Sequence, residues 1–150
     1  MNTIENRKII LFICTGNTCR SPMAEGLFRV LAEKYALRDV ECTSCGLSAF
    51  TGMPVTDFAV KAAAEYGADI SAHRSRPLTE YLLSQGDLFV CMTSRHADLL
   101  APYLPAEKLR VLGDGIPDPF GGTQEDYKTC AAAIYAALET MIQKDLEDKS

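Results

Sequence analysis

The chain has 150 residues, a formal net charge of −5 and 47% hydrophobic residues. A chain of this length forms one domain with a core large enough to fold without disulfides or a structural metal. Its acidic charge disfavours nucleic acid and anionic membranes as partners, and its longest apolar runs are shorter than the roughly 20 residues of a membrane-spanning helix. From the length we expect a single domain over residues 1–150, and from its polar residues we expect a loose lead-in at 1–8.

Strands and helices are predicted to alternate along the chain. The run Ile9–Ile13 is short and wholly apolar, which is typical of a strand buried on both faces of a parallel sheet. Pro22 suits the first turn of the following helix, whose apolar residues recur at helical spacing to about residue 36. Further strands are predicted at 40–44, 88–92 and 109–112, further helices at 57–66, 78–83, 94–100 and 124–145, and long loops at 46–54 and 113–122. This alternation indicates an α/β fold with helices on both faces of a parallel sheet, and ligands bind such sheets at the carboxyl ends of the strands.

The segment between the first strand and the first helix reads Cys-Thr-Gly-Asn-Thr-Cys-Arg-Ser over residues 14–21. Backbone N–H groups in such a loop can converge on an anion, and the helix N-terminus adds positive potential. Gly16 and Asn17 tolerate the left-handed backbone that a tight cradle needs. The planar Arg20 guanidinium matches two phosphate oxygens, and the local positive potential favours a Cys14 thiolate as nucleophile. The loop therefore predicts a phosphate site; the alternative is an ordinary strand-to-helix turn with a buried cysteine.

This segment resembles the signature of the low-molecular-weight protein tyrosine phosphatases, which is a cysteine, five residues, an arginine and a serine or threonine directly after the first strand. Cys14, Arg20 and Ser21 match it. The match continues at the start of the helix, at Pro22, Ala24 and Glu25. The resemblance covers nearly the whole chain. It implies a single-domain, three-layer α/β sandwich with a four-stranded parallel sheet flanked by helices.

The resemblance also implies the activity. We expect a cysteine-dependent protein phosphatase that forms a cysteinyl-phosphate intermediate, acts on phosphorylated proteins and uses no metal or other cofactor. A cytoplasmic location, a monomeric state and no nucleic-acid or membrane partner are expected with it. A non-catalytic phosphate-binding module is the contrasting class, but such a module could lose its nucleophile or acid, and this chain keeps Cys14, Arg20 and Asp118.

The general acid is predicted in the late loop. Cleaving a phosphate ester or phosphoramidate needs a proton donor for the leaving group, and a carboxylic acid on a loop suits this role. Asp118 is followed by Pro119 and Phe120, and the family carries its acid in an Asp-Pro-aromatic motif at this place. From the loop alone, Asp118 could equally shape a proline-rich turn. Asp114 lacks the following proline and is not expected to be the acid.

Family members support the phosphate loop with an asparagine, two serines and a histidine. By this resemblance Ser44 and His73 support the loop and keep its amides aimed, while Ser21 hydrogen-bonds the Cys14 thiolate. The residues expected to line the phosphate are Thr15, Gly16, Asn17, Thr18, Cys19 and Ser21. His96, at a helix start, is expected to lie on the surface.

The six cysteines are expected to be reduced thiols, because the chain lacks a signal-peptide pattern and several cysteines lie in apolar runs. Two interpretations of Cys19 stay open: a reversible disulfide with Cys14 that protects the nucleophile, or a packed loop cysteine. Cys42 and Cys45 form a C-x-x-C pair without the partners of a zinc site, so we expect the end of a strand.

The loop and the Asp-Pro-Phe-Gly-Gly sequence at 118–122 resemble those of the bacterial protein-arginine phosphatases. Tyrosine-specific members usually carry Ile or Leu where Thr18 stands, which packs against an aromatic ring. We therefore predict phosphoarginine as the preferred substrate, with Thr18 and Phe120 as selectivity residues and phosphotyrosine as the alternative. A thiol-dependent arsenate reductase shares this loop but needs further cysteines; Cys91 matches one, and residues 94–100 hold none.

Overall fold

Four parallel strands form one sheet in the order β2-β1-β3-β4 in the computed structural model, which describes residues 7–146. The strands are β1 (Lys8–Cys14), β2 (Val40–Gly46), β3 (Leu88–Cys91) and β4 (Leu109–Val111). Lys8 pairs with Val40 as the first residue of β1, so the prediction that it belongs to a loose lead-in is wrong. Residues 1–6 of that predicted lead-in lie outside the described residues.

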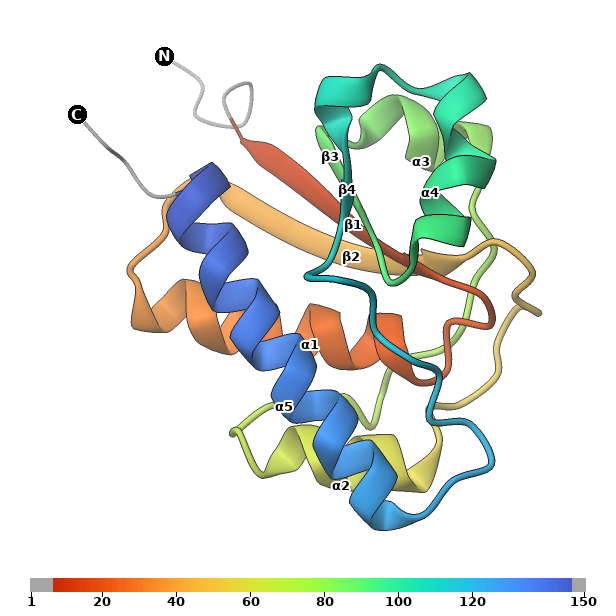
Figure 1. Ribbon diagram of the computed structural model, residues 1–150, viewed down its shortest axis with the longest axis vertical. Coiled ribbons are helices and arrows are strands. Elements are labelled where there is room, and N and C mark those ends of the chain that lie inside the picture. The colour runs from red at the N-terminus through yellow and green to blue at the C-terminus, as the bar shows by residue number, and fades with distance from the viewer. Residues whose placement is uncertain (1–6, 147–150) are drawn as a thin grey trace.

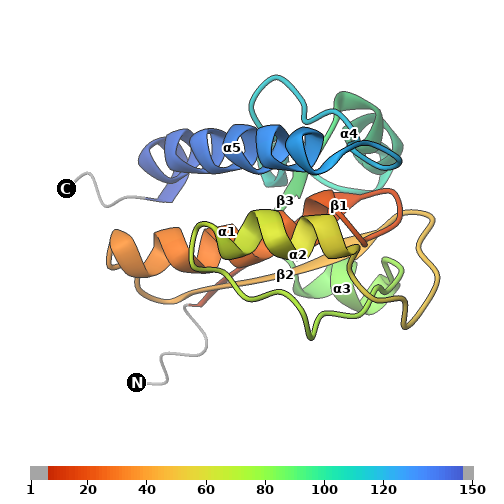
Figure 2. The same cartoon turned by 90° about the horizontal axis from the view of Figure 1, so that it is seen from below.

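The helices lie on both faces of the sheet and complete the predicted three-layer α/β architecture (Figures 1 and 2). They are α1 (Arg20–Lys34), α2 (Asp57–Ala64), α3 (Glu80–Gln85), α4 (Ser94–Leu100) and α5 (Gln124–Met141), the last continuing into a π-helical turn at Ile142–Leu146. Helices α1, α2 and α5 pack on one face of the sheet, and α3 and α4 pack on the other. The predicted helix at 78–83 begins two residues later because Thr79 caps it, its side chain accepting a hydrogen bond from the Leu82 N–H.

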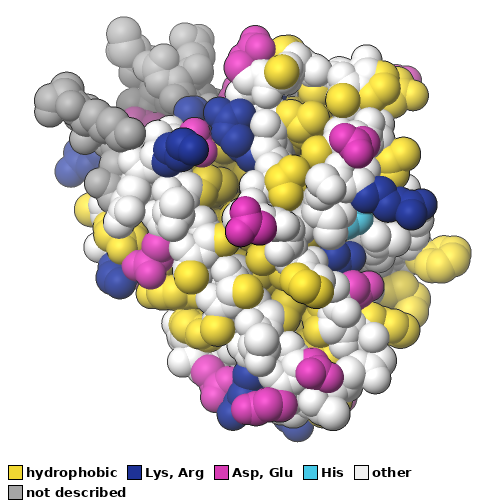
Figure 3. All heavy atoms as spheres, in the orientation of Figure 1, with side chains coloured by type: hydrophobic (Ala, Val, Ile, Leu, Met, Phe, Trp, Pro, Cys, Tyr) yellow, Lys and Arg dark blue, Asp and Glu magenta, His cyan; other side chains and the backbone are white. Residues whose placement is uncertain are grey.

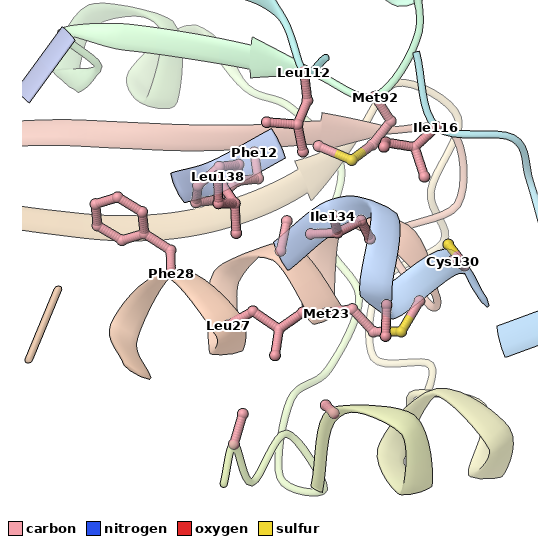
Figure 4. Packing of buried hydrophobic residues seen from close by; sticks show 14 of the residues in the cluster. Phe12, Met23, Leu27, Phe28, Met92, Leu112, Ile116, Cys130, Ile134 and Leu138 are labelled. Carbon is pink, nitrogen blue, oxygen red and sulfur yellow. The ribbon is translucent and has the colours of Figure 1, made fainter. Parts of the chain in front are cut away.

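The apolar run of β1 is buried on both faces, as its sequence predicts. Ile10 and Phe12 point into the larger core, and Leu11 and Ile13 into the smaller one. In the larger core the ring centroids of Phe12 and Phe28 lie 5.7 Å apart. Figure 4 shows side chains of α1 and α5 converging on those of the strands and of the loops that follow them. This packing fixes the strand ends from which the functional loops emerge.

Cys42 and Cys45 are three positions apart on β2, so their side chains lie on opposite faces of the sheet. Cys42 packs against the larger core and Cys45 lies in the smaller one. Burial raises the pKa of both thiols to about 12. The C-x-x-C pair is therefore part of the packing of a strand, and its two thiols cannot approach each other.

The surface mixes acidic and basic side chains among uncharged ones on the face that Figure 3 shows. Several large apolar side chains are exposed: Phe50, Met53, Phe58, Tyr81, Leu99, Tyr103 and Phe120. Within residues 7–146, every helix is too short or too polar to cross a bilayer.

Candidate active site

The candidate site lies where the two central strands end. After β1 the chain crosses to α1 on one face of the sheet, and after β3 it enters α4 on the other face. This divergence is the topological switch point at which open α/β sheets bind ligands. The loop at 15–19, the loop at 46–54 and the loop at 113–122 all follow the carboxyl ends of strands and meet at this edge (Figure 1).

The loop after β1 surrounds the Cys14 sulfur with hydrogen-bond donors. Cys14 is 2% exposed, its Sγ lies 2.9 Å from Ser21 Oγ, and the Asn17 amide N–H donates to the same sulfur at 3.3 Å. Asn17 has the expected left-handed backbone, with φ of 57°, whereas Gly16 does not share it. In this loop, therefore, Asn17 and not Gly16 uses the left-handed conformation that both residue types tolerate.

The loop also leaves backbone donors unused. Among the described residues, no acceptor pairs with the amide N–H of Thr15, Gly16, Thr18 or Cys19. Helix α1 begins at Arg20 without a side-chain cap from Cys19, so its first N–H groups also lack a capping partner. Free amides at a helix N-terminus form an anion-binding site.

Arg20 joins this loop to the loop after β4. Its side chain is buried, with the residue 5% exposed, and Nη1 donates to the Ile116 carbonyl at 2.9 Å. Its Nη2 lies 3.7 Å from Asp118 Oδ2. The Asp118 side chain is 52% exposed, and its Oδ1 accepts from the Phe120 N–H at 3.0 Å. Asp114, by contrast, lines a separate cavity of about 300 Å³ beside the end of α5.

A buried network of side chains holds the loop from behind. Asn17 Nδ2 donates to Ser21 Oγ at 2.8 Å and to Ser44 Oγ at 3.0 Å, while Asn17 Oδ1 lies 3.1 Å from His73 Nε2. Ser21 Oγ accepts from Asn17, so its own O–H is left to donate to Cys14 Sγ. The structure thus brings the predicted supporting residues Ser44 and His73 together with Asn17 and Ser21.

Two residues of this network were missed by sequence reasoning. Glu25, noted only as part of the motif, is 8% exposed and accepts a hydrogen bond from Ser44 Oγ at 2.6 Å. Its other oxygen pairs with Arg29 Nη1 at 2.7 Å. The Arg76 backbone N–H donates to Asn17 Oδ1 at 3.0 Å. The i,i+4 spacing of Glu25 and Arg29 predicts their pairing, but nothing local connects Arg76 to the loop.

Thr18 and Cys19 line the other side of the loop. Thr18 is half-buried, and its carbonyl accepts from the Thr56 N–H at 3.1 Å. Cys19 Sγ lies 3.5 Å from Thr56 Oγ1 and 3.6 Å from the Tyr127 hydroxyl, whose pKa burial raises to about 12. Cys14 and Cys19 are both free thiols. Cys19 is thus packed in the loop here, and its disulfide with Cys14 stays a prediction.

Phe120 lies two residues after Asp118 in the same loop. Its side chain is largely solvent-exposed, the residue being 73% accessible. Both residues line a groove of about 420 Å³ between the loop and α5. An aromatic face is therefore available next to the predicted acid.

His96 is not on the surface, and that prediction is wrong. The residue is 4% exposed because α4 starts directly against the phosphate loop. Its Nε2 lies 2.9 Å from Thr15 Oγ1, and its Nδ1 lies 3.0 Å from Thr93 Oγ1. Burial lowers the pKa of His96; Arg20 and Arg95 act in the same direction and Asp118 opposes them. The only sequence signal was its place one turn beyond a buried strand, at the edge where ligands bind.

Comparison with known proteins agrees with this geometry. A family model described as low molecular weight phosphotyrosine protein phosphatase matches residues 9–150. The chain belongs to this family and is a cysteine-dependent protein phosphatase. A protein-arginine-phosphatase of Bacillus subtilis (strain 168) is 35% identical over 150 residues, covering 93% of this chain and 98% of the relative. An arsenate reductase of Halalkalibacterium halodurans is 39% identical over 122 residues, covering 81% and 82%.

Solved structures share the fold over most of their length. A low molecular weight protein tyrosine phosphatase from T. tengcongensis is 36% identical with a TM-score of 0.84, covering 91% of this chain and 99% of that one. A YwlE arginine phosphatase mutant with a phosphorylated active site serine is 36% identical with a TM-score of 0.82, covering 91% and 97%. The family model shows the class of enzyme. The relatives include phosphatases with two different named substrates and an arsenate reductase, so the comparisons do not select the preferred substrate.

Proposed function

We propose that this phosphatase hydrolyses phosphoarginine in proteins, with Cys14 as nucleophile, Arg20 as the phosphate clamp and Asp118 as general acid. The observation that carries the mechanism is the environment of the Cys14 sulfur. The sulfur accepts hydrogen bonds from the Ser21 hydroxyl and from the Asn17 backbone N–H, in a loop whose other backbone N–H groups are free. Such donors stabilise a thiolate and the negative charge of a bound phosphoryl group.

In the first step the Cys14 thiolate attacks phosphorus, forming the P–S bond as the P–N bond to the guanidinium breaks. The loop amides and Arg20 hold the equatorial oxygens through the transition state. Asp118, protonated, gives its proton to the leaving nitrogen. The products are a free arginine side chain, phosphorylated Cys14 and an Asp118 carboxylate.

In the second step water attacks the phosphorylated cysteine, and the Asp118 carboxylate takes a proton from that water. The P–S bond breaks and Cys14 leaves as a thiolate, which the Ser21 hydroxyl stabilises. Inorganic phosphate is released, and the enzyme returns to its starting protonation state. The YwlE arginine phosphatase mutant with a phosphorylated active site serine supports such a phosphoenzyme.

The preference for phosphoarginine rests on Thr18 and Phe120. Thr18 presents a small polar side chain in the loop and is half-buried. A hydroxyl here accepts a hydrogen bond from a guanidinium, whereas Ile would offer an apolar surface to a phenyl ring. The exposed ring of Phe120, beside Asp118, suits stacking on the planar cation. The resemblance to a protein-arginine-phosphatase supports this choice.

Phosphotyrosine is the alternative substrate within the same mechanism. Arsenate reduction is disfavoured because Cys91, the candidate second cysteine, is 0% exposed on β3 and burial raises its pKa to about 12. A thiol in that state is a poor nucleophile for passing on a disulfide.

The test compares kcat/KM on matched phosphoarginine and phosphotyrosine peptides. We expect wild type to prefer phosphoarginine and Thr18→Ile to lower that preference by roughly tenfold, the scale of one side chain in a pocket. Thr140→Ile is the matched control, because Thr140 is exposed on α5 away from the loop. A wild-type preference for phosphotyrosine would contradict the proposed substrate. An unchanged preference in Thr18→Ile would remove Thr18 as its cause.

A further inference from the structure

The backbone pairing between the two central strands stops just before the site. The Met92 N–H donates to the Ile13 carbonyl at 2.9 Å, and beyond this bond the two chains turn to opposite faces of the sheet. Thr15 therefore stands at the diverging edge, and it is exposed. Burial does not fix its conformation, so its position depends on hydrogen bonds.

A side-chain bridge continues the connection between these two chains. The imidazole of His96 spans from Thr93, two residues after the end of β3, to Thr15, which directly follows Cys14. Whichever ring nitrogen carries the proton, a neutral imidazole donates to one threonine hydroxyl and accepts from the other. The Thr93 hydroxyl is itself placed, because it accepts the His96 backbone N–H as the cap of α4.

Thr15 has a second anchor on the side of β2. Its carbonyl accepts from the Ser48 N–H at 3.0 Å, and a Cβ on Gly46 would lie only 2.5 Å from that carbonyl oxygen. The residue is thus held between the extensions of both neighbouring strands. On the β3 side the hydrogen bond to His96 is its only hydrogen bond within residues 7–146.

We propose that His96 is a positioning residue for the phosphate loop: through Thr15 it aims the first free amide after Cys14 at the bound phosphoryl group. This rests on the proposed function of the loop. Neither chemical step uses His96, yet the residue is buried against the site and bonded at both ring nitrogens. Loss of the bridge leaves Cys14 and Arg20 in place and loosens one of the free amides that would stabilise the charge of the transition state.

The experiment is a double-mutant cycle on Thr15→Val and His96→Leu, with turnover of p-nitrophenyl phosphate and inhibition by vanadate as readouts. Each single change is expected to lower kcat/KM by about fivefold to tenfold, the worth of one hydrogen bond. Vanadate, which mimics the transition state, should weaken as an inhibitor by the same factor while the substrate KM changes less. The double variant should be no worse than the poorer single variant, because both remove one interaction.

Two further variants separate positioning from folding. His96→Gln can place an amide near the position of Nε2 and should recover most of the activity that His96→Leu loses. Asp98→Asn, exposed on the same helix, should match wild type. Thr15→Val changes an exposed residue, so it keeps the test available if His96→Leu folds poorly. Losses that multiply in the double variant, or a loss of turnover without weaker vanadate inhibition, would overturn the positioning role.

Cys14→Ser distinguishes the two levels of the proposal. If it retains wild-type activity, the proposed function of the loop fails. If it is inactive and the Thr15 and His96 effects are independent, only the role of His96 fails.

Discussion

At the scale of single residues, a network of buried hydrogen bonds supplies the Cys14 sulfur with a donor. The direction of each hydrogen bond in this network decides whether that donor is available. The side-chain amide of Asn17 donates to both Ser21 and Ser44, so each serine keeps its own hydroxyl proton for another acceptor. Ser21 directs its proton to Cys14, and Ser44 directs its proton to the Glu25 carboxylate. A side-chain amide that turned around would reverse both donations, and the Cys14 sulfur would lose a donor.

Because the pKa of His96 is lowered in the folded protein, we expect stability to depend on pH near the ordinary pKa of histidine. The unfolded chain takes up a proton on this histidine near pH 6.5, whereas the folded chain takes it up only at lower pH. In that window the unfolded state binds more protons, so His96 costs stability as the pH falls below about 6.5. Melting temperatures measured from pH 7 to pH 5.5 should therefore fall more steeply for wild type than for His96→Gln. Parallel curves would contradict the shift.

At the scale of elements, the start of α5 fixes the end of the loop that carries Asp118. The Thr123 hydroxyl accepts from the Asp126 N–H, and the Asp126 carboxylate accepts from the Thr123 N–H at 2.9 Å. Just before this capping box, the Gly122 N–H donates to the Pro119 carbonyl at 2.8 Å. A Cβ on Gly122 would lie 2.5 Å from an Asp126 oxygen and 2.9 Å from the Pro119 carbonyl oxygen, so this junction favours glycine.

Loss of this cap should be measurable. Thr123→Ala leaves the Asp126 N–H without its acceptor, and we expect the free energy of unfolding to fall by about 1 kcal/mol in urea denaturation. Thr129→Ala is the control, because Thr129 is exposed within the same helix and alanine is the better helix former there. Equal effects of the two substitutions would show that the cap contributes nothing.

The elements themselves were largely predictable from sequence. The strand at 9–13 and the strand at 88–92 were found to within a residue because wholly apolar runs of that length suit a buried strand. Helix α1 starts two residues before Pro22 because the phosphate loop runs directly into its first turn. Lys8 was missed because strand pairing, and not its polar side chain, decides its conformation.

At the scale of the whole molecule, the strand order β2-β1-β3-β4 brings distant residues to one edge of the sheet. The predicted alternation of strands and helices was confirmed, but local patterns say nothing of which strands are neighbours. Cys14, Arg20 and Ser21 were found because they are close in sequence. The contact between Thr15 and His96 spans 81 positions, so no periodicity could predict it, and His96 was assigned to the surface.

The most direct test of the account is to trap phosphorylated Cys14. Asp118→Ala is mixed with p-nitrophenyl phosphate, whose leaving group needs no proton, so attack by Cys14 proceeds while activation of water is lost. After an acid quench, mass spectrometry should find one phosphoryl group on the peptide that contains Cys14, at Cys14 itself, and none in Cys14→Ala combined with Asp118→Ala. Continued turnover with no phosphoryl group on Cys14, or with the group on another residue, would contradict the account.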